Sequence, residues 1–255
     1  MKQIKKFISN KYFAYFLGFV FLFLLWYIIS LCVDENVMVF PNPFATFKET
    51  FVILSSSYIY KCMASSFLRI LIGFLISLFL AMVFGIIAGN LPFIKRFLLP
   101  LITTLKSIPT ATLVFFFLVL VGAKNAPILM VILISFPILY ESVAKGIENI
   151  DENVKNATSL DGSKNIDTIV KIQIPLLTPY LLVGISSSFA LSFKIEIMAE
   201  ILTGDTRLGL GAAILSAQRN DPTNMVPIFA YSLVVILFVL LISLLSKLIN
   251  KALID

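Results

Sequence analysis

Long runs without a charged residue dominate this 255-residue chain and alternate with short polar segments. A helix needs about 20 mostly apolar residues to cross the hydrocarbon core of a bilayer. Six runs reach that length, two of them only when neighbouring residues are included. We therefore expect an all-α, polytopic membrane protein with six transmembrane helices in a single domain, 1–255. The expected spans are about 12–33, 64–90, 97–123, 125–149, 174–199 and 222–247.

Composition supports this interpretation, because 59% of the residues are hydrophobic and only 13% are charged. A soluble domain of this length would carry roughly twice that charged fraction. The net charge of +6 is explained by orientation rather than by nucleic-acid binding. Lys2, Lys5, Lys6 and Lys11 precede the first span, and basic residues accumulate on the cytoplasmic side of a membrane. We expect both termini to be cytoplasmic.

Two absences argue against catalysis by this chain. It contains no histidine, which removes histidine-based triads and histidine-dependent zinc sites. It also lacks the G-x-x-x-x-G-K-[ST] pattern that cradles nucleotide phosphates. Cys32 and Cys62 flank the first external segment, and we expect them to act as small apolar side chains rather than as a disulfide.

Small residues recur every four positions in the second expected span. Such a stripe lets two helix backbones approach closely in lipid, where packing drives association. Arg69 lies on the same face, just before the stripe. The five small residues are Gly73, Ser77, Ala81, Gly85 and Gly89.

Two prolines, Pro100 and Pro109, bracket residues 101–108 in the third expected span, and Lys106 lies between them. Proline removes a helix hydrogen bond, so we expect a broken or kinked segment. Such a segment is tolerated in a membrane where protein or a water-filled cavity covers the freed carbonyls.

Ionisable side chains within the spans have two interpretations. They form either a polar gate along a translocation path or an ion-pair network that locks helices together. A third alternative for Arg69 and Lys194 is that they extend to the external interface. The candidates for the path or gate are Lys106, Ser188, Ser192, Lys194, Glu196 and Glu200.

A polar insert, residues 150–173, follows the fourth expected span. Its charges alternate in sign, while Ala157, Leu160 and Ile169 contribute to an apolar ridge. A partner protein could take such a ridge into a groove. The alternative is a solvated loop without a partner.

Within this insert, residues 156–175 read NATSLDGSKNIDTIVKIQIP. They resemble the EAA loop of bacterial ABC importer permeases: E-A-A, three residues, G, nine residues, I, one residue, L-P. Gly162, Ile172 and Pro175 stand in register with this pattern. The chain departs from it at three positions, with Asn156 for the glutamate, Thr158 for the second alanine and Ile174 for the leucine.

Other segments extend the resemblance over most of the chain. In order and spacing they are similar to permease subunits of type I ABC importers for sulfonates, taurine and nitrate, and their thiamine-precursor and riboflavin relatives. The segments are Phe40-Pro41-Asn42-Pro43, Ser66-Phe67-Leu68-Arg69, Ile108-Pro109, Ala199-Glu200 and Gly209-Leu210-Gly211.

The resemblance implies a permease homodimer in a bacterial cytoplasmic membrane, with no cofactor on this chain and no nucleic acid. Two P-loop ATPase subunits, carrying ATP and Mg, would bind inside, and a substrate-binding protein would bind outside. A coupling helix in the insert would contact the ATPase through Asn156, Ala157, Thr158, Leu160, Asp161, Gly162, Ile172 and Pro175. The expected structural residues are Arg69, Gly73, Gly85, Gly89 and Pro109.

The expected substrate is a small organic solute such as a sulfonate, taurine or nitrate. Because Lys194 and Glu196 stand where sulfonate-type members are expected to be uncharged, a thiamine precursor, riboflavin or an amino-acid-like aromatic solute is the alternative. Three rival classes are a stand-alone secondary carrier, a membrane-embedded hydrolase and the coupling subunit of a vitamin transporter. The last class docks its ATPases through arginine-bearing helices, and this insert contains no arginine.

Overall fold

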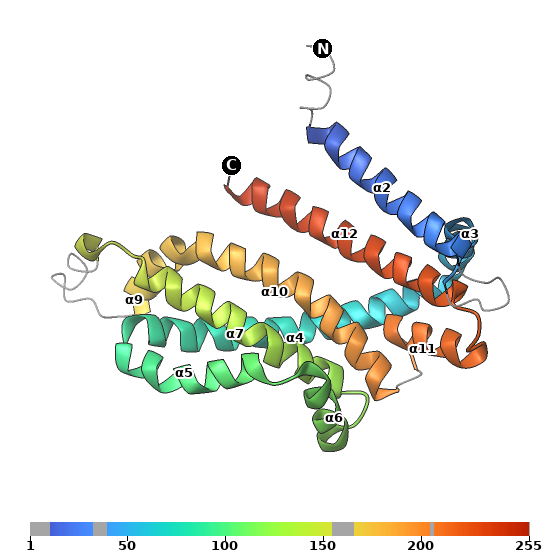
Figure 1. Cartoon of the computed structure of the whole chain (residues 1–255). Coiled ribbons are helices and arrows are strands. Elements are labelled where there is room, and N and C mark those ends of the chain that lie inside the picture. Colours follow the sequence, from blue (N-terminus) through green and yellow to red (C-terminus); the bar gives the residue numbers. More distant parts are fainter. Residues whose placement is uncertain (1–10, 33–39, 155–165, 205–206, 255) are drawn as a thin grey trace, which may run out of the picture. The chain divides into compact units, whose positions relative to one another are not determined.

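The computed structural model describes residues 11–32, 40–154, 166–204 and 207–254, and the expected all-α class is confirmed (Figure 1). The elements are α2 (Lys11–Cys32), α3 (Pro43–Ser55), α4 (Ser57–Asn90), α5 (Pro92–Ser107), α6 (Thr110–Val121), α7 (Ala126–Glu148), the single turn α9 (Ile166–Thr168), the π-helical turn η1 (Ile169–Gln173), α10 (Ile174–Thr203), α11 (Leu210–Asn220) and α12 (Val226–Ile254).

Five of these helical segments are long and apolar enough to cross a membrane, or six if the bent pair α5–α6 is one span. The boundaries differ from the expected spans in two places. The helix that contains the second expected span, α4, begins at Ser57 rather than near residue 64. The third span is not one helix, because α5 and α6 meet at 97°.

The chain folds into two compact units. One comprises residues 1–60 and 213–236, and the other comprises residues 61–212 and 237–255. In the first unit, the side chain of Asn42 accepts a hydrogen bond from the Phe44 amide at 2.9 Å and so caps α3. The indole of Trp26 donates to the Pro41 carbonyl at 3.1 Å, and its ring packs on Phe47 and Phe229. An aromatic cluster thus holds α2 and α3 together.

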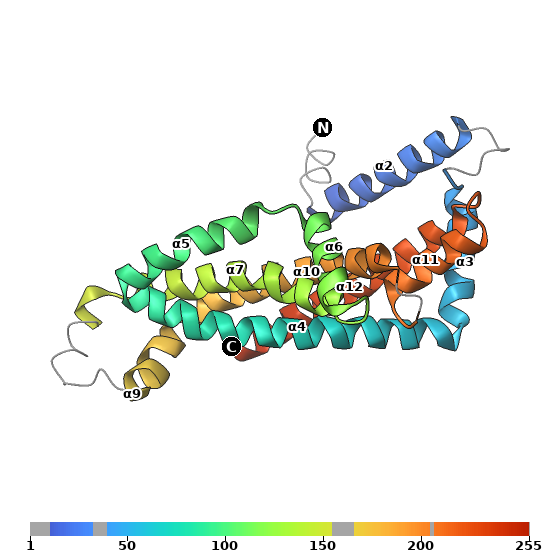
Figure 2. The same ribbon diagram turned by 90° about the horizontal axis from the view of Figure 1, so that it is seen from below.

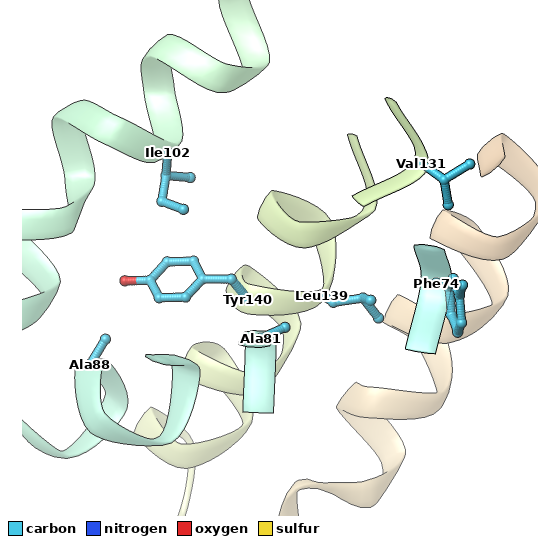
Figure 3. Packing of buried hydrophobic residues seen from close by; sticks show 7 residues of the cluster. All are labelled: Phe74, Ala81, Ala88, Ile102, Val131, Leu139 and Tyr140. Atoms are coloured by element: carbon cyan, nitrogen blue, oxygen red, sulfur yellow. The ribbon is translucent and has the colours of Figure 1, made fainter. Parts of the chain in front are cut away.

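In the second unit, α4, α7 and α10 run alongside one another (Figure 1, Figure 2). Figure 3 shows part of their core, which joins residues of α4, α5 and α7. Phe74 of α4 also contacts Phe189 of α10 edge to face, with ring centroids 5.0 Å apart. The cluster comprises Phe74, Ala81, Ala88, Ile102, Val131, Leu139 and Tyr140.

Glycines set the spacing between these helices. A Cβ added to any of three α4 glycines would meet a branched side chain of α7 at less than 3 Å, a separation that real Cβ atoms do not adopt. These contacts are Gly73 with Val131 at 2.9 Å, Gly85 with Val143 at 2.7 Å and Gly89 with Ile147 at 2.6 Å. On the other side of α7, Gly146 faces Leu177 of α10 at 2.9 Å. The small-residue stripe therefore lies on the α4–α7 contact, where glycine is required.

The break between α5 and α6 falls at Ile108 and Pro109, not at Pro100. Pro109 is extended and occupies the N-cap of α6, so its missing N–H removes no bond from within a helix. Pro100 lies inside α5 without ending it. At the other end of α6, Gly122 has a φ of 77°, which only glycine adopts without strain.

Both cysteines are free thiols, Cys32 exposed and Cys62 buried. Gly18 of α2 offers a matched position for testing the glycine contacts, because a Cβ added there meets nothing within 4 Å.

We expect Gly89→Val to lower the free energy of unfolding by about 1–3 kcal/mol, because the new side chain overlaps Ile147. Gly18→Val should leave it nearly unchanged. Thermal unfolding of the two variants in detergent micelles, followed by circular dichroism, checks the difference. Equal thermal midpoints would contradict the close approach of α4 and α7.

Candidate functional site

A cluster of charged side chains joins the N-terminal half of α4 to the C-terminal end of α10. Glu196 and Glu200 are one helical turn apart on α10, and both are fully buried, at 0% and 2% exposed. Arg69 of α4 donates from Nε to Glu196 Oε1 at 2.9 Å and from Nη2 to Glu200 Oε1. One guanidinium thus pairs with two carboxylates, in a setting where burial would penalise an uncompensated charge.

Ser66 extends the cluster from the turn before Arg69. Its hydroxyl donates to Glu200 Oε1 at 2.9 Å and accepts from the Leu210 amide at 2.8 Å. The Gly211 amide donates to the other oxygen of Glu200 at 2.6 Å. Glu200 therefore accepts bonds from both α4 and the start of α11, and it fixes the two segments to α10.

The Gly209-Leu210-Gly211 segment lies directly on this ion pair. A Cβ at Gly209 would overlap the carboxylate of Glu200 and the guanidinium of Arg69. A Cβ at Gly211 would lie 2.5 Å from the Ile197 carbonyl and 2.6 Å from Glu200 Cβ. Arg69 also donates to the Leu208 carbonyl at 2.9 Å. Glycine is thus needed at both positions so that the backbone can reach the charges.

The geometry of Glu196 and Glu200 is that of an ion-pair network. Arg69 is turned into this network and does not extend to the interface, which corrects one of the sequence-based alternatives. Lys194 is separate, because its side chain is exposed and it forms no ion pair with a described residue. The pairing of Arg69 with the two glutamates was not predicted from the sequence. Arg69, Glu196 and Glu200 lie at the same end of their expected spans, and this shared location was the indication of their pairing that the sequence offered.

The remaining path candidates form local groups of their own. Lys106, at the end of α5, pairs with Glu141 of α7 at 2.8 Å. Ser188 and Ser192 are buried on α10 and donate to the carbonyls four residues earlier. Ser192 also bonds to Ser135 of α7 at 2.8 Å. Among the described residues, no hydrogen bond or ion pair joins Lys106 to the serines or to the Arg69 network.

Most candidate coupling residues lie outside the described residues, namely Asn156, Ala157, Thr158, Leu160, Asp161 and Gly162. Ile172 lies in η1, and Pro175 is in the first turn of α10. A proline there cannot donate to the carbonyl four residues back. The wider η1 turn immediately precedes it, with the Ile174 amide bonded five residues back to Ile169, and this accommodates the proline without ending the helix.

An amide pair that the sequence did not reveal lies beside this turn. The side chains of Asn90, the last residue of α4, and Gln173 exchange two hydrogen bonds of 3.0 Å each. The end of α4 is therefore tied to the turn that leads from the insert into α10. In the part of the chain that the structure describes, no group of acidic or cysteine side chains could hold a metal ion.

Comparison with known proteins decides the family. The family described as "Binding-protein-dependent transport system inner membrane component" matches residues 81–255. This chain belongs to that family. It is the transmembrane permease subunit of a type I ABC importer for small solutes, and the family is one of transport permeases rather than enzymes. Glu196, Glu200 and the Gly209–Gly211 segment lie within the matched region; Ser66 and Arg69 precede it.

Individual relatives of the permease are distant. It is 22% identical, over 72% of its length and 74% of theirs, to a protein of Brucella melitensis named as a probable ABC transporter permease. It is 25% identical, over 79% of its length and 73% of the relative's, to a Bacillus subtilis protein named "Putative aliphatic sulfonates transport permease protein SsuC". With the nitrate import permease protein NrtB of Leptolyngbya laminosa it shares 25% over 64% of its length and 58% of that protein's.

We expect Arg69→Met to lower the free energy of unfolding by about 3–5 kcal/mol, because it leaves two buried carboxylates without a counter-charge. Glu200→Gln should cost more than Glu196→Gln. Glu200 bonds to Arg69, Ser66 and the Gly211 amide, whereas one oxygen of Glu196 has no hydrogen-bond partner in the described part of the chain.

Thermal unfolding of the purified variants measures this order. The double variant Arg69→Met with Glu196→Gln should recover part of the loss, because one uncompensated charge is removed. If Arg69→Met unfolds at the wild-type temperature, the ion pairs contribute nothing to the fold.

Proposed function

We propose that the permease acts as a homodimer that forms the translocation path of an ATP-driven importer. Two P-loop ATPase subunits bind on the cytoplasmic side and hydrolyse ATP with Mg, and an extracytoplasmic binding protein delivers the solute. The chain itself binds no cofactor. The observation that carries the proposal is the family match over residues 81–255, because the family's description names a transport system that depends on a binding protein.

In this proposal both termini face the cytoplasm of a bacterial cell. The support is the concentration of lysines before α2 and the basic residues near the α4–α5 connection, Lys95 and Arg96. The 150–173 insert then lies on the same side as the ATPases.

The insert is proposed as the element that docks to the ATPase. Gly162, Ile172 and Pro175 keep the spacing of the EAA loop, and the apolar ridge supplies a surface for a groove. Its end is connected to two helices, directly to α10 through η1 and to α4 through the Asn90–Gln173 amide pair. A displacement of the docked insert is therefore passed to both helices rather than absorbed by a loose joint.

Transport requires ligands that distinguish two conformations, because a ligand shifts an equilibrium only by its difference in affinity for the two states. ATP would supply that difference inside, and the loaded binding protein would supply it outside. Closure of the ATPase dimer would draw the two inserts of the homodimer together and change the spacing of the helices behind them.

We place the translocation path along α5 and α10, near Lys106, Ser188, Ser192 and Lys194. The support is the exposed ammonium of Lys194, which forms no ion pair with a described residue, and the 97° bend that follows Lys106. A bend of this kind within a membrane needs protein or a water-filled cavity to cover its carbonyls. In a homodimer, two copies of these residues would face a shared path.

The proposed solute is a sulfonate, taurine, nitrate or a related compound, in line with the names of two relatives. The carboxylate of Glu196 does not argue against an anionic solute, because its negative charge is paired with Arg69 within the protein. A thiamine precursor, riboflavin or an amino-acid-like aromatic solute is the alternative.

Co-purification tests the docking proposal. When the permease is tagged and expressed with its neighbouring genes, a P-loop ATPase should co-purify in equal amount. Replacing Ala157 and Gly162 with arginine should abolish this, because bulky charges at the proposed ridge and turn prevent seating in a groove. Lys124→Gln, in the turn before α7, is the control and should retain the ATPase.

Equal ATPase recovery with wild type and the Ala157 and Gly162 variant would refute docking through this insert. If no ATPase is recovered with any form, and solute uptake into vesicles proceeds without ATP, a stand-alone carrier replaces the proposal. Size-exclusion profiles of the variants must match wild type for either result to count.

A transport assay tests the path. We expect Lys194→Gln to reduce ATP-dependent uptake of an anionic solute severalfold in reconstituted vesicles while ATPase recovery is unchanged, because Lys194 supplies an unpaired positive charge. Lys194→Arg should retain uptake. If Lys194→Gln transports at the wild-type rate, this residue does not line the path.

A further inference from the structure

A cavity of about 180 Å³ lies between α5 and α7, at the end of these helices that carries Lys95 and Lys145. Leu99 and Ile102 of α5 and Ala144 of α7 form its walls. This cavity is distinct from the Arg69 network; one of its lining residues, Glu141, pairs with Lys106 of the proposed path.

Tyr140 reaches into this space from α7. The residue is only 4% exposed, and its hydroxyl has no hydrogen-bond partner among the described residues. Figure 3 shows the ring extending from α7, with its oxygen between Ile102 and Ala88. A buried hydroxyl without a partner is unfavourable, and such groups are rare in native proteins. A ligand that accepts a hydrogen bond would satisfy it.

The charges around the cavity favour a negative ligand. Lys95 pairs with Glu148 at 2.5 Å, and Lys106 pairs with Glu141 at 2.8 Å. Lys145 is exposed and forms no ion pair with any described residue. Three cations and two anions leave one positive charge beside the unpartnered hydroxyl, so the complementary group is an oxyanion.

The apolar walls indicate what carries this oxyanion. A water molecule occupies about 30 Å³, so the cavity is larger than a bare inorganic anion requires. Phe93 and Phe97 of α5 are highly exposed, at 76% and 70%, which is typical of a surface that faces acyl chains. Basic pockets between membrane helices on the cytoplasmic side bind anionic lipid head groups.

We propose that this cavity binds an anionic phospholipid, with Tyr140 donating a hydrogen bond to a phosphate oxygen. Lys145 balances the phosphate charge, and the first carbons of the lipid lie against Leu99 and Ile102. The bound lipid fills the space between α5 and α7 close to the insert that follows α7.

Native mass spectrometry of the full-length permease in micelles tests the site, with phosphatidylglycerol and phosphatidylcholine as probes. Wild type should retain phosphatidylglycerol in preference to phosphatidylcholine. Tyr140→Phe should bind phosphatidylglycerol about tenfold more weakly, the usual effect of losing one hydrogen bond to a charged group. It should still fold, because the lost hydroxyl has no partner within the protein.

Lys145→Gln should also weaken phosphatidylglycerol binding, and Lys124→Gln, at the other end of α7, should not. The same titration with hexanesulfonate separates a membrane lipid from a soluble amphiphile. Binding of hexanesulfonate that depends on Tyr140, without binding of phosphatidylglycerol, would overturn the lipid assignment. Wild-type phosphatidylglycerol binding by both Tyr140→Phe and Lys145→Gln would overturn the site.

Discussion

The close approach of α4, α7 and α10 is the constraint on which the second unit depends. Lipid tails are as apolar as leucine, so helices in a membrane gain little from burying apolar surface and must gain from contact instead. Glycines on α4 remove the side chains that would separate it from α7, and Gly146 does the same between α7 and α10. The pairing of Arg69 on α4 with the two glutamates of α10 depends on this close packing.

At one end of this bundle the short spacing makes the buried ion pairs feasible. Arg69 meets two carboxylates of α10, and the backbone of Gly209–Gly211 fits against them because no Cβ intervenes. Burying a charge is costly unless it is paired and hydrogen-bonded. The cluster meets that condition for Glu200 through the Ser66 hydroxyl and the Gly211 amide. It therefore fixes the relation of α4, α10 and the start of α11.

At the other end, the ion pairs are more exposed. Lys95 and Lys106 each join α5 to α7, and a cavity lies between these two bonds. The amide pair of Asn90 and Gln173 connects α4 to the turn before α10.

The sequence by itself determined the membrane class, the helical fold and the family, because these depend on run length, composition and the order of motifs along the chain. It also predicted a broken or kinked segment between Pro100 and Pro109, since the loss of a backbone donor is a local property. It did not determine which proline ends a helix: Pro100 and Pro109 look alike in sequence, yet Pro100 lies within α5.

Only the tertiary structure decided which charges meet. Arg69 and Glu200 are separated by most of the chain, and their pairing follows from the packing of α4 against its neighbours and from the Gly209–Gly211 backbone beside them. The unpartnered hydroxyl of Tyr140 was equally invisible, because a tyrosine in an apolar run has no partner or cavity until α5 folds against α7. Helix formation and helix breaks depend on neighbouring residues and can be predicted from the sequence. Charge pairing and cavities depend on distances between residues far apart in the chain, and the sequence does not give these distances.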